Sequence, residues 1–185
     1  RFHIAAIRRS FEPGAIDKVI RLCQRHIGSN WITYFTGRLR HALDIVSNGR
    51  LELGIGAGWN EEESGAYGIE LGSIKERFDR FEEACEVLAS LLSKETTSFD
   101  GKFYQLKDAR NEPKGPQKPH PPICIGGSGE KRTLPLTARY ADHWNFAGGP
   151  PEEFARKRDV LAARCADIGR DPKEITLSAH VRLEP

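Results

Sequence analysis

The chain has 185 residues, of which 38% are hydrophobic and 29% are charged, and its formal net charge is +2. This length suits one domain with a hydrophobic core, and the small net charge argues against nucleic acid or an anionic membrane as a partner. No apolar stretch reaches the roughly 20 residues that a membrane-spanning helix needs.

The cysteines and the missing methionine bear on the environment and completeness of the chain. Cys23, Cys85, Cys124 and Cys165 form no C-x-x-C pair, and none has a histidine at metal-ligand spacing. We therefore interpret them as buried or neutral thiols in a reducing cytoplasm. Because the sequence has no methionine and stops within a predicted strand, we expect it to be a piece of a longer protein.

The first half of the chain contains three predicted helices, a strand and a hairpin. Apolar periodicity favours helices at 16–27 and 38–47, and the second is followed by a strand at 50–56. The capping box from Ser73 to Glu76 opens a helix that runs to about Ser93. Residues 96–106 are predicted to form a hairpin with Asp100 and Gly101 at its turn. An extended proline-rich connector, 111–122, follows.

In the second half, strands are predicted at 122–127, 142–149 and 174–183, with helices at 129–141 and 151–169. This alternation indicates parallel strands joined by crossover helices, either in a doubly wound sheet or in a barrel. In both architectures ligands bind at the carboxyl ends of the strands. Glycines cluster at these ends, around Gly56, Gly127 and Gly148.

The stretch 51–63, LELGIGAGWNEEE, has glycines at every second position after a predicted strand. A dinucleotide loop needs the pattern G-x-G-x-x-G, which this spacing misses by one residue, and the acidic run 61–63 would repel a pyrophosphate. We therefore reject a nucleotide loop here. Two interpretations stay open: the glycines let a helix pack closely, or Gly56, Trp59 and Asn60 line a cleft.

The stretch 126–133, GGSGEKRT, is the better candidate for an anion site. Its glycine-rich backbone can form a nest of N–H groups, and the helix that begins next adds its dipole. Lys131 and Arg132 add positive charge, although the Walker pattern G-K-[ST] is absent. We predict a phosphate site, and a plain N-cap is the alternative. The expected phosphate-binding residues are Gly126, Gly127, Ser128 and Gly129, with Lys131 and Thr133 as helpers.

No catalytic acid or base is assigned from the sequence. Asp142 and His143 are adjacent in a predicted strand and point to opposite faces, so they do not form a ready dyad. We interpret Trp144 as core or pocket wall and His143 as structural. No histidine has partners at metal-binding spacing, so no metal site is expected.

Three stretches, 43–88, 99–106 and 119–145, together strongly resemble the bacterial luciferase-like monooxygenase family, and most of all its branch that uses the deazaflavin coenzyme F420. The resemblance covers about residues 42–180. It implies an α/β fold, a TIM (β/α)8 barrel that is incomplete at its N-terminal side and truncated at its C-terminal end. Residues 1–185 would form a single domain in which 1–36 match poorly and 37–185 hold strands four to seven with their helices.

The resemblance also implies where the cofactor lies. The loop at Gly126–Gly129 would hold its phosphate, and the strand tip from Gly56 to Asn60 would line its pocket. The first barrel strands, which carry much of the ring contact in the family, are missing or degraded. His143 departs from the family, which commonly has glycine there. Barrels of this family often pair, which suggests a homodimer.

The expected function is therefore that of an oxidoreductase that uses F420 for hydride transfer to or from a small organic substrate. An FMN-dependent monooxygenase of the same family is the first alternative. A non-redox barrel that binds a phosphorylated metabolite, or an inactive paralogue, is the second. The chemistry would belong to the cofactor, and the protein would supply phosphate binding, orientation and a dry pocket.

Overall fold

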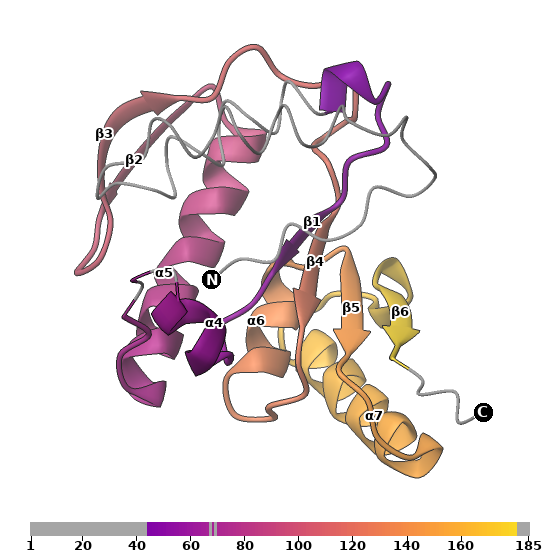
Figure 1. The fold of residues 1–185 in the computed structure, drawn as a ribbon. Coiled ribbons are helices and arrows are strands. Elements are labelled where there is room, and N and C mark those ends of the chain that lie inside the picture. Colours follow the sequence, from indigo (N-terminus) through magenta and orange to yellow (C-terminus); the bar gives the residue numbers. More distant parts are fainter. Residues whose placement is uncertain (1–43, 67, 69, 181–185) are drawn as a thin grey trace. The chain divides into compact units, whose positions relative to one another are not determined.

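The computed structural model describes residues 44–66, 68 and 70–180 (Figure 1). The described chain divides into two compact units, one holding 53–85 and 122–180 and the other holding 44–52 and 86–121. The predicted helix at 16–27 and most of the one at 38–47 lie outside the described residues, although residues 44–46 are helical. Within the described ranges, no helix is both long enough and apolar enough to cross a membrane.

The first unit is built on a four-stranded parallel sheet in the order β1-β4-β5-β6. The strands are β1 (Leu53–Ile55), β4 (Ile123–Gly126), β5 (His143–Phe146) and β6 (Thr176–Ala179). In register, Gly54 lies beside Cys124, and Cys124 beside His143. The arrows of Figure 1 run in the same direction along the sheet. The prediction of an α/β fold with parallel strands is therefore confirmed.

Helices join these strands as the alternation predicts. The two crossover helices of the sheet are α6 (Thr133–Tyr140) and α7 (Pro151–Asp167), and α5 (Ile74–Ser93) follows the capping box. Two short elements were not predicted: α4 (Glu61–Ala66) and the 3-10 helix η2 (Pro172–Glu174). The sequence of α4, EEESGA, has no apolar periodicity, so nothing in the pattern indicated a helix there.

The core of this unit lies on the face of the sheet that α6 and α7 cover. Trp144 and Phe146 of β5 are almost completely buried there, and Phe154 of α7 stacks on Trp144 with ring centroids 5.6 Å apart. The other core residues are Leu134, Ala138, Leu161, Cys165 and Ile175. Because side chains alternate along a strand, His143 and Asn145 lie on the opposite face of β5.

The second unit contains the predicted hairpin. Strands β2 (Thr96–Asp100) and β3 (Gln105–Arg110) pair antiparallel, and Gly101 N–H donates to the Tyr104 carbonyl at 2.9 Å to close the turn. Asn111, which is buried, follows the hairpin and donates its amide to the Leu91 carbonyl at 3.0 Å. The hydrogen bond anchors the start of the proline-rich connector.

The start of α5 gives a direct test of the capping box. Ser73 Oγ accepts the Glu76 backbone N–H at 3.2 Å. We expect Ser73→Ala to lower the free energy of unfolding by about 1 kcal/mol, because it leaves an N-terminal donor of the helix without its acceptor. Urea denaturation followed by circular dichroism measures this loss. Ser73→Asp keeps an acceptor at the same place and serves as the control. Equal losses for the two variants would show that the cap does not stabilise the helix.

Candidate functional site

The loop between β4 and α6 takes a shape that requires its glycines. Gly127 has φ +111°, a value that side-chain-bearing residues rarely adopt. A Cβ at Gly129 would lie 3.0 Å from Thr133 Oγ1, so the loop runs close to α6 and a larger residue there would require the Thr133 side chain to shift. At Gly126, by contrast, a Cβ would meet nothing within 4 Å. The strand end is therefore open space, and the loop beyond it folds tightly over the start of α6.

Two hydrogen bonds hold this loop to β5. Trp144 Nε1 donates to the Gly127 carbonyl at 2.7 Å, and Gly127 N–H donates to the Asn145 carbonyl at 3.1 Å. This differs from the predicted nest, because the Gly127 N–H is already used within the protein. Among the described residues, the backbone N–H groups of Ser128 and Gly129 have no protein acceptor. These two donors are therefore the ones left for an anion.

Ion pairs hold the loop to the neighbouring helices. Glu130 accepts from Lys157 at 2.8 Å and from Arg156 at 2.7 Å, both on α7, and these hydrogen bonds lower its pKa to about 2. Arg132 pairs with Asp79 at 2.7 Å and with Glu82 at 3.0 Å, both on α5.

These pairs correct one expectation about charge. Arg132 was expected to add positive charge to a phosphate site, but two carboxylates already neutralise it. Lys131 is exposed, and no ion pair or hydrogen bond of its side chain occurs within the described part of the chain. Of the two cations predicted at this loop, Lys131 is the one with a charge available for an anion.

The tip of β1 lies beside the end of β4, but its aromatic residue faces solvent. A Cβ at Gly56 would come within 3.9 Å of the Gly126 carbonyl oxygen, so the two predicted glycines are neighbours. The Trp59 side chain is 75% exposed. Asn60 is half-buried, and its carbonyl accepts the Ser64 N–H at 3.1 Å. The structure thus brings Gly56 to Gly126 and leaves Trp59 as a surface residue of this chain.

A polar cluster that the sequence did not reveal lies on the face of the sheet opposite the core. Ser178 of β6 lies 2.6 Å from His143 Nε2 and accepts the Asn145 amide at 2.8 Å. Asn145 is in register with Gly126 on one side and Ser178 on the other. Glycines over β1 and β4 and polar side chains over β5 and β6 therefore share this face. The cluster depends on which residues of β5 and β6 lie side by side, and this strand register cannot be deduced from a single sequence.

Asp142, the residue before β5, bonds to the backbone of β4. Asp142 Oδ2 accepts the Ile123 backbone N–H at 2.8 Å and so joins β5 to the start of β4. The prediction that Asp142 and His143 form no dyad agrees with this geometry, since His143 bonds to Ser178.

Burial raises the pKa of the Cys85 and Cys165 thiols, as expected for neutral thiols. Cys23 lies outside the described residues, and the expected absence of a metal site stays a prediction.

Comparison with known proteins places these features in a family. The pyrimidine monooxygenase RutA of Rhizobium rhizogenes is 32% identical over 146 residues, which are 76% of this chain and 39% of that protein. The FMNH(2)-dependent dimethylsulfone monooxygenase of Pseudomonas putida is 29% identical over 144 residues, covering 77% of this chain and 39% of the relative. The chain thus spans about two fifths of the length of these relatives.

A solved structure shares the fold of this chain. The structure of the coenzyme F420 dependent tetrahydromethanopterin reductase from Methanopyrus kandleri superposes with a TM-score of 0.70 at 19% identity, covering 83% of this chain and 46% of that one. The sequence model of the luciferase-like monooxygenases matches residues 41–183, which is more than half of the chain. The chain belongs to the luciferase-like monooxygenase family.

Proposed function

We propose that this chain forms the phosphate-binding side of the cofactor site in an F420-dependent oxidoreductase that transfers hydride to or from a small organic substrate. The observation that carries the proposal is the loop after β4, with its two free N–H donors at Ser128 and Gly129 and the charge of Lys131. The nest and a nearby cation are a common way to bind a phosphate. Thr133 lies against the loop and adds a hydroxyl.

The strand ends give this site room for a flat ring. Gly56 and Gly126 carry no side chain where β1 and β4 end, and a Cβ at Gly126 would meet nothing. Asn145 and Ser178 bring polar groups to the same face of the neighbouring strands. A bound deazaflavin would supply the redox chemistry. The chain itself would hold the phosphate, and its glycine surface would leave a place for the ring. We assign no acid or base.

FMN is the alternative cofactor, in a monooxygenase of the same family. The P. putida relative is named for FMNH2 and the M. kandleri reductase for F420. Both cofactors carry a phosphate on a side chain of the ring, so the loop suits either. F420 is our first choice from the sequence resemblance. A barrel without redox activity that binds a phosphorylated metabolite through this loop, or an inactive paralogue, is the second alternative.

The architecture of the whole protein is part of the same proposal. We propose that β1, β4, β5 and β6 correspond to strands four to seven of one TIM barrel domain. The parallel order of the four strands supports this assignment, because a barrel needs parallel neighbours joined by crossover helices. A cytoplasmic location, suggested by the free Cys85, Cys124 and Cys165, and a homodimer complete the proposal.

Ligand titration separates the proposed functions. We expect the full-length protein to bind F420 more tightly than FMN, because the sequence resembles the F420 branch most. Both should bind more tightly than a phosphosugar such as ribose 5-phosphate, because the glycine surface leaves room for a ring. Fluorescence follows the two flavins, and calorimetry follows the phosphosugar. Tighter binding of FMN would favour the monooxygenase. Tighter binding of the phosphosugar would overturn the redox proposal, and binding of none would favour the inactive paralogue.

A charge placed at Gly126 tests whether this loop binds the phosphate. Gly126→Asp adds a carboxylate where a Cβ has open space, so the fold is expected to persist. Repulsion of the phosphate should weaken flavin binding by roughly tenfold or more. Gly126→Asn has nearly the same shape without the charge and is the matched control. Equal affinity in the Asp and Asn variants would mean that the phosphate is bound elsewhere.

A further inference from the structure

Cys124 of β4 and His143 of β5 lie side by side on the face of the sheet opposite the core. They are partners in the parallel register, and Cys124 Sγ and a ring nitrogen of His143 lie within 4.8 Å of each other. Both residues are half-buried, so neither is sealed in the core. On the β1 side, the residue in register with Cys124 is Gly54, which has no side chain. The sheet therefore places a thiol and a titratable ring together on a partly accessible surface.

The ring of His143 is held from the far side by β6. Ser178 Oγ lies 2.6 Å from His143 Nε2 and accepts the Asn145 amide at 2.8 Å. A thiol, a base beside it and a third group that orients the base form the arrangement that activates cysteine nucleophiles. A protonated imidazole within about 4–6 Å stabilises a thiolate, which is the reactive form of cysteine. The surroundings of Cys124 therefore favour a reactive thiol.

The other described cysteines of this unit are shielded. Cys85 and Cys165 are 1% and 0% exposed, and burial raises the pKa of both thiols. A buried neutral thiol reacts slowly, because the thiolate is the nucleophile. Among the described cysteines, Cys124 is therefore the one placed for reaction.

We propose that Cys124 is a modification site that forms mixed disulfides with small disulfide compounds, and that His143 activates its thiol. The Cys124 thiolate attacks one sulfur of the disulfide. A new S–S bond to Cys124 forms, the S–S bond of the compound breaks, and its second half leaves as a thiolate that takes up the proton held by His143. One thiol and one disulfide thus become another thiol and another disulfide, with no further oxidant.

A group attached to Cys124 would reach the proposed flavin site. Cys124 and Gly126 point to the same face of β4 and lie two residues apart, which is about 7 Å along a strand. A Cβ at Gly126 would meet nothing within 4 Å, and this is the space that we propose for the ring. A mixed disulfide at Cys124 would fill it and so block the flavin. This consequence rests on the proposed function, whereas the reactivity of Cys124 does not.

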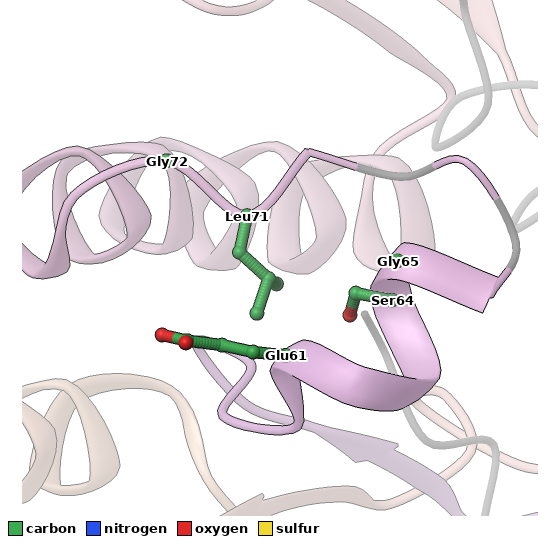
Figure 2. Close-up of a pocket in the computed structure, with 5 residues that line it drawn as sticks. All are labelled: Glu61, Ser64, Gly65, Leu71 and Gly72. Carbon is green, nitrogen blue, oxygen red and sulfur yellow. The ribbon is translucent and has the colours of Figure 1, made fainter.

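A pocket of about 230 Å³ between α4 and the start of α5 is a separate feature of this unit (Figure 2). Figure 2 shows the Glu61 carboxylate extending away from Ser64, and the residues that line the pocket include no cysteine. A compound lodged there would not become attached to the protein. Covalent labelling of a thiol therefore reports on the sheet and not on this pocket.

Thiol labelling of the full-length protein, without any flavin, tests the reactivity. We expect dithiodipyridine, a small uncharged disulfide, to modify Cys124 at least roughly tenfold faster than Cys85 and Cys165. Absorbance of the released pyridinethione measures the rate, and peptide mass spectrometry identifies the modified cysteine. A Cys124 that reacts no faster than the two buried cysteines would overturn the proposal.

Histidine variants test the activation in the same assay. His143→Asn keeps a polar side chain beside Ser178 but removes the base, and it should slow the reaction of Cys124 by roughly tenfold. His180→Asn makes the same replacement at an exposed histidine beyond β6 and should leave the rate unchanged. The rates of Cys85 and Cys165 report on the fold, because unfolding would expose both. Equal rates for Cys124 in the two folded variants would show that His143 does not activate the thiol.

Flavin titration after labelling tests the consequence. Modification of Cys124 should weaken flavin binding by roughly tenfold or more, because the attached group occupies the space for the ring. Cys124→Ser cannot form the disulfide and should keep its affinity through the same treatment. Unchanged affinity of the modified protein would contradict the block. Failure of the untreated protein to bind any flavin would instead count against the proposed function, and the labelling rates would still decide the reactivity of Cys124.

Discussion

The hydrogen bond from Trp144 to Gly127 links the core of the first unit to its proposed binding loop. The indole of Trp144 is fully buried, and a buried indole N–H needs an acceptor. It finds this acceptor in the loop carbonyl at 2.7 Å, while its ring stacks on Phe154. The position of the loop is therefore set by the packing of β5 against α7. A change in that packing would reach the loop without touching a residue that we propose to bind phosphate.

Successive side chains of β5 point to opposite faces of the sheet. Trp144 and Phe146 fill the core, while His143 and Asn145 face away from it and meet Ser178 of β6. On that face, β1 presents Gly54, and β4 presents Cys124 beside His143 and Gly126 beside Asn145. A residue at position 143 therefore influences the polar cluster more than the core. This makes a histidine tolerable at a place where the resemblance led us to expect glycine.

Much of the fold follows from local signals in the sequence. The Ser73 cap, the Asp-Gly turn and the strand-helix alternation each depend on residues close together in the chain, and the structure has all three. The site was predictable only in part, because its roles depend on distant partners. The glycines of the loop could be read from the sequence. The neutralisation of Arg132 by Asp79 could not, because those residues meet only when α5 and the loop are brought together.

The charges of the first unit explain how an acidic segment can follow β1 in a protein proposed to bind phosphate. The carboxylates near the loop after β4 are paired: Glu130 with α7, and Asp79 and Glu82 with Arg132. Glu61 pairs at 3.5 Å with Arg77 of α5, whose side chain is 12% exposed, so the acidic run after β1 also has a cation beside it. Cations of the same unit therefore balance the carboxylates near the loop after β4, and these carboxylates do not oppose an anion there.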